Sequence, residues 1–214
     1  MYFFEKQFMN RPDTNTVIQQ YAQEADYEYA RKFQRAERRQ QSLLGRCLIR
    51  KLAIRFKPDT NAADWQIMAR KNLPPQLSHP KLDTTPYVNV SHSHELVAVN
   101  LASVSLIGVD VEFMAKSRDI HQIVEAITAE DNKLSLPADK TKLYAIWCLY
   151  ESWYKMNPVN HNPPIPMQII DWINSAKLDY RAIKAELKID NMTMQATITI
   201  EPHLDYVITE TIEL

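Results

Sequence analysis

The chain has 214 residues, of which 45% are hydrophobic and 24% are charged, and its formal net charge is −1. Such a composition is typical of a globular protein with a real hydrophobic core. No apolar run reaches the ~18 to 20 residues that a membrane helix needs. The N-terminus lacks a basic segment followed by an apolar one, so we expect a cytoplasmic protein with no membrane partner.

The charge is distributed unevenly along the chain. Residues 1–100 hold 15 Lys and Arg against 10 Asp and Glu, whereas residues 101–214 hold 10 against 16. A basic half and an acidic half together suit an anionic ligand that is held beside a cation-binding group of carboxylates.

Cysteine and glycine are rare in this sequence. Cys47 and Cys148 are the only cysteines, and each lies in a helix-like stretch, so we expect two buried, reduced thiols. Gly45 and Gly108 are the only glycines. Glycine within a helix costs about 1 kcal/mol relative to alanine, so Gly45 indicates a close approach of a packed element or a ligand.

Two helices are predicted near the N-terminus, after a short first segment. A helical pattern runs from about Thr16 to Phe33, and a second helix lies between Arg31 and Lys57, where ten basic residues face one acid. Its apolar stripe leaves Arg46 and Arg50 on the other side. These arginines form either a solvated face or a cradle for phosphate, which Arg binds bidentately, and nucleic acid is the rival ligand.

Residues 57–86 carry five prolines and little periodicity, which predicts a long loop with one helical turn near residues 65–70. Residues 87–104 then alternate as two strands, with Ser91 to His94 at the bend or strand start. His92 is either a structural histidine or a phosphate ligand. Together with His94 it could also bind zinc, but no third soft ligand lies near in sequence.

The stretch from Ser105 to Phe113 predicts a strand with an unusual face. Side chains alternate in a strand, so Gly108, Asp110 and Glu112 share one side. Adjacent carboxylates repel each other unless water screens them or a cation joins them, and Mg²⁺ prefers carboxylate oxygens. The pair is therefore either a candidate metal site or the solvated face of an ordinary strand.

A helix is predicted around residues 120–127, and a second one spans Tyr144 to Lys155. Apolar side chains recur on one face of the second helix and leave Glu151 and Lys155 together on another. A Glu four residues before a Lys is commonly a surface pair worth about 0.3 kcal/mol. The alternative is a third carboxylate and a cation that reach the same site as Asp110 and Glu112.

The C-terminal region carries the clearest strand pattern. A loop rich in Pro and Asn, 157–166, precedes alternating segments at 185–189 and 192–200, which are joined by a turn at Asp190 and Asn191, and a last strand at 206–214. Each half of the chain thus has helices and antiparallel strands. We place the boundary near Ala102, which gives a basic half, 1–101, and a second half, 102–214.

Four motifs in this order resemble the Sfp-type 4′-phosphopantetheinyl transferases, of the holo-[acyl-carrier-protein] synthase superfamily. They are LLGRCLIRKL (43–52), VNVSHS (88–93), IGVDVE (107–112) and the helix with Trp147, Tyr150, Glu151, Ser152 and Lys155. The resemblance runs from about Glu28 to Lys155. Tyr150 departs from the family's usual Lys, and Ser78-His79-Pro80 stands where the family often has Gly-Lys-Pro, so two phosphate contacts are missing.

The resemblance implies an α+β fold in which two similar α/β halves with antiparallel sheets pack about a pseudo-twofold axis, with the active site in the cleft between them. It implies a monomeric, Mg²⁺-dependent enzyme that transfers the 4′-phosphopantetheine moiety of coenzyme A to a serine of an acyl or peptidyl carrier protein and releases adenosine 3′,5′-bisphosphate. Such enzymes serve fatty acid, polyketide or nonribosomal peptide biosynthesis.

The resemblance also assigns residues to roles. Asp110, Glu112 and Glu151 would hold Mg²⁺, Glu151 or a metal-bound water would accept the serine proton, and Lys155 would stabilise the leaving group. The residues that would bind the phosphates of coenzyme A are Arg46 and His92, with Ser91, Arg39, Arg50 and Lys81 as further contacts.

Two other functional classes stay open. A nucleic-acid-binding module would use the basic cluster at 31–57, but it leaves Asp110 and Glu112 without a role. A non-catalytic relative, or a metal-dependent phosphohydrolase, would keep the carboxylates and tolerate the changes at Tyr150 and His79. We expect no nucleic-acid partner.

Overall fold

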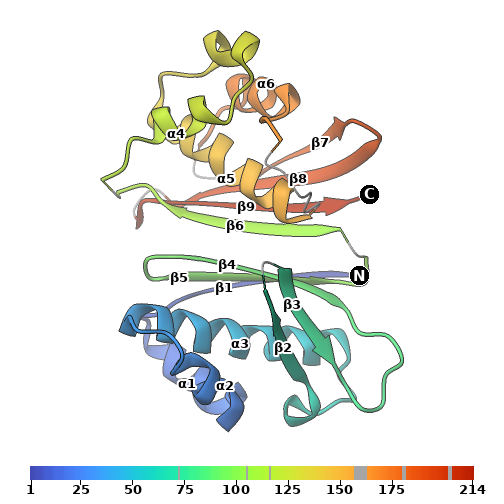
Figure 1. Ribbon diagram of the computed structural model, residues 1–214. Helices are drawn as coiled ribbons and strands as arrows, with labels where there is room; N and C mark the ends of the chain where they lie inside the picture. Colours follow the sequence, from blue (N-terminus) through green and yellow to red (C-terminus); the bar gives the residue numbers. More distant parts are fainter. Residues whose placement is uncertain (72, 105, 116, 157–162, 180–181, 202–203) are drawn as a thin grey trace. The chain divides into compact units, whose positions relative to one another are not determined.

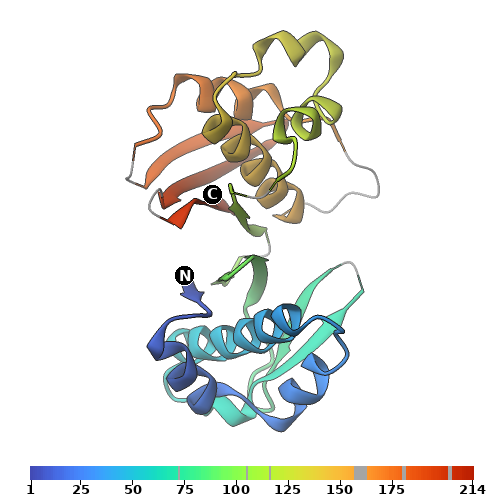
Figure 2. The same ribbon diagram turned by 90° about the vertical axis from the view of Figure 1, so that its left-hand side faces the viewer.

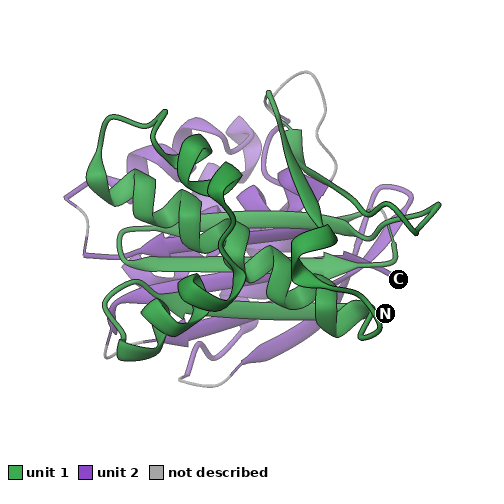
Figure 3. Cartoon of the chain, turned by 90° about the horizontal axis from the view of Figure 1, so that it is seen from below, with its two compact units in different colours: residues 1–107 green, residues 108–214 purple. Residues whose placement is uncertain are grey.

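The computed structural model describes residues 1–71, 73–104, 106–115, 117–156, 163–179, 182–201 and 204–214 (Figure 1). Ser105 and residues 157–162 of the expected loop lie outside these ranges. The chain divides into two compact units, residues 1–107 and 108–214, which Figure 3 colours separately. The division falls slightly later than the boundary at Ala102 that the sequence suggested, because Ala102 is the last residue of a strand within the first unit.

The first unit is built on a three-stranded antiparallel sheet. Its strands, in spatial order, are β1 (Tyr2–Phe8), β5 (Leu96–Ala102) and β4 (Tyr87–Ser93). The long helix α3 (Ala36–Phe56) packs on this sheet, and the short helices α1 (Pro12–Tyr21) and α2 (Glu24–Ala30) pack on α3 (Figure 1). The core of this unit therefore lies between α3 and the sheet, where Leu44, Leu48 and Leu52 are fully buried.

A separate two-stranded antiparallel sheet completes the first unit. It consists of β2 (Gln66–Arg70), which follows the short 3-10 helix η1 (Ala62–Asp64), and β3 (Leu73–Ser78). The sequence predicted a loop with a helical turn here, which is wrong. Pro74 and Pro75 made a strand improbable, yet proline is tolerated in an edge strand because its missing N–H is not needed by a neighbour there.

The second unit contains a four-stranded sheet in the order β6 (Ile107–Phe113), β9 (Tyr206–Glu213), β8 (Met192–Glu201) and β7 (Ile183–Ile189). Helix α5 (Lys140–Met156) lies on one face of this sheet and contacts β9 and β8 (Figure 2). The helices α4 (Ile120–Ala126) and α6 (Met167–Ser175) pack against α5, and a 3-10 helix, η2 (Glu130–Ser135), contacts α6.

The structure confirms a mixed α+β fold with small antiparallel sheets. The two hairpins at 87–102 and 183–201 are also confirmed, and their turns place His94 and Asp190 at positive φ (49° and 52°). The single helix expected at 16–33 is instead two, because the backbone is extended at Ala22 and Gln23 begins α2 with a capping box. Among the described residues, no helix is long and apolar enough to span a membrane.

Candidate functional site

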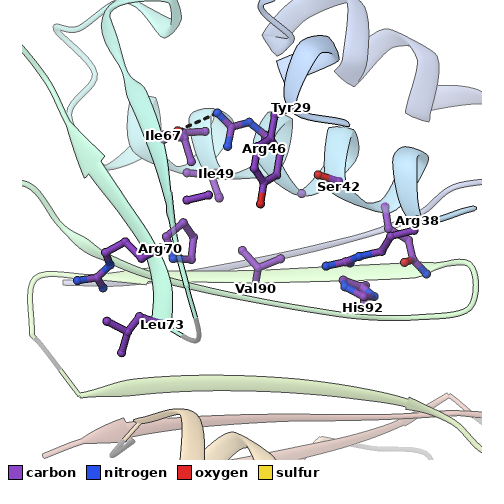
Figure 4. A pocket seen from close by; sticks show the side chains of 14 residues that line it. Tyr29, Arg38, Ser42, Arg46, Ile49, Ile67, Arg70, Leu73, Val90 and His92 are labelled. Carbon is purple, nitrogen blue, oxygen red and sulfur yellow. Dashed lines mark hydrogen bonds between the residues drawn. The ribbon is translucent and has the colours of Figure 1, made fainter. Parts of the chain in front are cut away.

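A pocket of about 260 Å³ lies in the first unit between α3, the β2–β3 hairpin and β4 (Figure 4). Arg38, Arg46, Arg70 and His92 bring basic groups to its wall. The apolar part of the lining consists of Ile49, Ile67, Ala69, Leu73, Pro75 and Val90. The pocket thus combines a cationic lining with an apolar one, as a ligand with phosphates and a flat ring would require.

The helix α3 supplies one wall of this pocket through a regular spacing. Arg38, Ser42, Arg46 and Ile49 recur every three or four residues and therefore share a face of the helix. Gly45 lies on the same wall, and a Cβ there would meet Val90 Cγ1 at 3.3 Å, so the helix is closely packed on β4. The expectation that Gly45 marks a close approach is confirmed.

A buried ion-pair cluster holds Arg46 in place. Asp26 of α2 is fully buried, and its carboxylate accepts a hydrogen bond of 2.5 Å from Arg46 Nε and a further one from Arg50. A second Arg46 nitrogen donates to the Ile67 carbonyl (2.8 Å), and the guanidinium lies 4.9 Å from the centre of the Tyr29 ring. Burial alone would raise the pKa of Asp26, but the hydrogen bonds from the two arginines outweigh it and lower that pKa.

The other residues proposed for phosphate binding do not line the pocket. Arg50 is 1% exposed and also donates to the carbonyl oxygen of Trp65, which gives it a structural role. Arg39 donates to two backbone carbonyls just before α3, at residues 33 and 34. Ser91 lies on the face of β4 opposite to Val90 and His92, and Lys81 is exposed and is not part of the pocket lining.

His79 is part of the core of the first unit. It is 5% exposed, its ring lies 4.9 Å from that of Trp65, and its Nδ1 accepts from the Lys81 backbone N–H. Its imidazole therefore cannot serve as a phosphate contact without leaving this packing.

In the second unit, β6 carries its carboxylates into the protein. Asp110 is 4% and Glu112 9% exposed, so the alternative of a solvated strand face is wrong. The close approach of α5 explains this burial. A Cβ at Gly108 would lie 1.8 Å from the carbonyl oxygen of Ser152 and 2.6 Å from Thr211 Oγ1. Only glycine at this position lets α5 lie so close to β6.

Each of the two β6 carboxylates is engaged by a cation. Lys155 Nζ donates to Asp110 Oδ1 at 2.5 Å and to the Val109 carbonyl at 3.3 Å. Glu112 Oε1 accepts from Trp147 Nε1 at 2.7 Å, while its Oε2 lies 2.6 Å from Arg118. The strand and helix motifs therefore meet, as the sequence suggested: Lys155 pairs with Asp110, and the charge of Glu151 also acts on Lys155.

The charge of Asp110 acts on the other ionisable groups around it. Burial, and then the charge of Asp110, raise the pKa of both Glu112 and Glu151. Burial disfavours the Lys155 ammonium, but Asp110 outweighs it and raises the pKa of that lysine. The charges of Asp110, Glu112 and Glu151 thus act on one another, while Arg118 and Lys155 oppose the rise in pKa that this repulsion causes.

The donor chemistry fits a hard divalent cation, since it consists of carboxylate oxygens from β6 and α5. The geometry is less complete, because within the described parts of the chain no three His, Cys, Asp or Glu side chains gather as a metal-binding group. His92 and His94 are likewise not part of such a group. Asp110 forms an ion pair with Lys155, and Glu112 forms one with Arg118.

Tyr150 is a core residue. It is 4% exposed, its hydroxyl donates to the Pro163 carbonyl at 2.7 Å, and its ring lies about 6 Å from those of Trp153 and Tyr154. Burial raises its pKa to about 12. Cys47 and Cys148 are buried free thiols, as expected, and burial raises the pKa of Cys47 to about 12 as well.

Sequence reasoning missed several residues of both sites. Arg38 and Ser42 carried a signal, the helical spacing that they share with Arg46. Tyr29 and Arg70 carried none, because they come from elements far apart in sequence. Arg118 carried none either, since it follows the strand outside every motif.

Comparison with known proteins adds no assignment. No family model matches the chain, and no curated protein matches it.

Proposed function

We propose that this protein is a 4′-phosphopantetheinyl transferase of the Sfp type. It moves the phosphopantetheine arm of coenzyme A to a serine hydroxyl of an acyl or peptidyl carrier protein and releases adenosine 3′,5′-bisphosphate. The observation that carries the proposal is the meeting of β6 and α5: the contact of Lys155 with Asp110 joins two sequence motifs that are 45 residues apart.

The pocket of the first unit supports the same proposal. Arg46 and His92 come from two other motifs, and both line this pocket. Charge-assisted hydrogen bonds from Arg, and from His in its protonated form, suit phosphate oxygens. Arg38, Arg70 and Ser42 add donors at the same wall, which offsets the loss of the two family lysines at positions 79 and 150.

The chemistry that the proposal requires is phosphoryl transfer at a pyrophosphate, for which a bound Mg²⁺ would supply positive charge. Asp110, Glu112 and Glu151 are the residues that would hold the ion. Glu151, whose pKa is raised by burial and by Asp110, is a stronger base than an exposed glutamate and is the residue that would accept the serine proton. Lys155 is the group that would stabilise the leaving phosphate.

The proposal extends to the whole enzyme. We propose that the two units are similar halves about a pseudo-twofold axis, with the active site in the cleft between them. We also propose that the enzyme is a cytoplasmic monomer.

One observation favours a second candidate. The pairing of Asp110 with Lys155 and of Glu112 with Arg118 is also what a non-catalytic relative would retain after losing its metal. Such a protein would bind coenzyme A or its nucleotide end without transferring the arm.

The test is direct. The purified chain is incubated with coenzyme A, Mg²⁺ and several apo-carrier proteins, and each carrier is examined by intact-protein mass spectrometry. We expect the phosphopantetheine adduct on at least one carrier, and none on the same carrier with its acceptor serine replaced by alanine. Binding of coenzyme A without any adduct on any carrier would favour the second candidate.

A further inference from the structure

Arg118 is a cation at the acidic group that belongs to none of the sequence motifs. It lies between β6 and α4, next to Asp119, whose side chain caps α4 by accepting from the Gln122 N–H at 3.0 Å. Its guanidinium lies 2.6 Å from Glu112 Oε2. Because Trp147 already occupies Oε1, this contact engages the second oxygen of the same carboxylate.

We infer that Arg118 is a built-in competitor for the divalent cation: it neutralises Glu112 in the metal-free protein and must leave that carboxylate when the cation binds. This inference rests on the proposed function, because it concerns the same metal site. It adds a role for a residue that neither the motifs nor the resemblance assigns.

The electrostatic reason is the repulsion between like charges in a buried place. Glu112 is 9% exposed, so a divalent cation and a guanidinium on the same carboxylate would face each other with little water between them. Such an arrangement is costly, whereas exchange of one cation for the other keeps the carboxylate compensated. The neutral Trp147 donor can stay.

Arg118 is easier to displace than Lys155. Lys155 belongs to α5, which is fixed on β6 at Gly108, and its ammonium also donates to the Val109 carbonyl. Arg118 instead meets one oxygen of Glu112 and the side chain of Tyr144, and its buried Nε has no hydrogen-bond partner within the described part of the chain. A guanidinium that contacts a carboxylate through one nitrogen is held less firmly than one that forms a bidentate pair.

The structure also offers Arg118 a place to stay after it leaves Glu112. The guanidinium carbon lies 5.2 Å from the centre of the Tyr144 ring, within the range of a cation–π contact. The side chain is 25% exposed, so it can turn toward water while it keeps this contact. Lys140 approaches the same ring at 5.8 Å without an ion pair to Glu112, which makes it a matched control.

The test measures binding of Mn²⁺ alone to the full chain without coenzyme A, from the electron paramagnetic resonance signal of the free ion. Arg118→Gln should bind Mn²⁺ at least about fivefold more tightly than the wild type, the lower end of typical coupling between sites. Lys140→Gln removes the same charge near the same ring and should change the affinity by less than about twofold. Equal or weaker binding by folded Arg118→Gln, or no Mn²⁺ binding by either protein, overturns the inference.

A second measurement uses the wild type alone, so it tests the inference even if Arg118→Gln does not fold. The side-chain Nε–H resonance of Arg118 in the wild type should shift as Mg²⁺ is added, because its carboxylate partner is taken. A resonance unchanged at saturating Mg²⁺ overturns the inference. The proposed function fails separately, through the absence of a carrier-protein adduct, whatever the order of the Mn²⁺ affinities.

Discussion

Replacement of Gly108 by alanine tests the packing that brings the strand and helix motifs together. The added Cβ would lie 1.8 Å from the Ser152 carbonyl oxygen, and real Cβ atoms essentially never come within 3.0 Å of another atom. Ser152 O belongs to the backbone of α5, so rotation of a side chain cannot relieve this contact. Either β6 or α5 must shift by about 1 Å.

The cost of this shift is estimated from overpacking in protein cores. Inserted methylene groups usually destabilise by about 1 to 3 kcal/mol, and contact with a rigid backbone atom belongs at the upper end. Against this, a Gly to Ala change gains about 0.4 to 1 kcal/mol by restricting the unfolded chain. We therefore expect Gly108→Ala to lower the free energy of unfolding by about 2 kcal/mol and to reduce transfer, since Glu151 and Lys155 move with α5.

Gly45→Ala is the matched control, because these are the only two glycines in the chain. Its Cβ would meet only side-chain methyl groups, of which the nearest is Val90 Cγ1 at 3.3 Å, and alanine is the better helix former by up to about 1 kcal/mol. Urea unfolding followed by circular dichroism should show this variant to be as stable as the wild type or more so. If Gly108→Ala matches the wild type within about 0.5 kcal/mol, the close approach of α5 to β6 is wrong.

Three further predictions follow from the two sites. Tyr150→Lys buries an ammonium in an aromatic cluster, so it should lower the melting temperature through a loss of a few kcal/mol while the KM for coenzyme A stays unchanged; a lowered KM would place residue 150 in the binding site. Arg46→Ala and His92→Ala should each weaken coenzyme A binding by about 1.5 to 3 kcal/mol, and whichever residue binds the 3′-phosphate should matter much less with dephospho-coenzyme A; equal losses on both substrates by both variants would reject this division. Asp26→Asn leaves two arginines uncompensated and should cost about 3 to 5 kcal/mol at pH 7. Folding lowers the pKa of Asp26, so the stabilisation by its ionised carboxylate is complete above about pH 4 and is lost as the pH falls through the folded-state pKa. The difference in free energy of unfolding between the wild type and Asp26→Asn should therefore become smaller in acid. A difference that does not change with pH would contradict this role of Asp26.

The sequence predicted the parts of the fold whose patterns are local. The hairpins around His94 and Asp190 and the helix that carries Glu151 and Lys155 follow from periodicity and turn residues. The strand β1 escaped prediction because most of its residues are half-buried, which blurs the alternation between the faces of a strand. Helix α6 was not predicted either, although Ile169, Ile170 and Ile173 share its buried face and follow directly after the Pro-rich loop.

Local sequence patterns did not predict the burial or the charge partners of the candidate site residues. The alternation of Gly108, Asp110 and Glu112 was visible, but their burial depends on α5, whose Ser152 lies 44 positions after Gly108. The same limit applies to Arg50, whose role is decided by Asp26, a residue 24 positions away on another helix. A sequence gives the types of charged residue, whereas the partner of each charge depends on tertiary packing.

The central claim is tested most directly by following both products of one reaction. The wild type, with coenzyme A, Mg²⁺ and a competent apo-carrier protein, should release one adenosine 3′,5′-bisphosphate for each carrier that gains the arm. Asp110→Ala, which removes a carboxylate from the proposed metal site, should be folded and at least ~10²-fold slower. Release of the bisphosphate without modification of the carrier, or near-normal turnover by Asp110→Ala at saturating Mg²⁺, would contradict the proposal that this protein is a metal-dependent phosphopantetheinyl transferase.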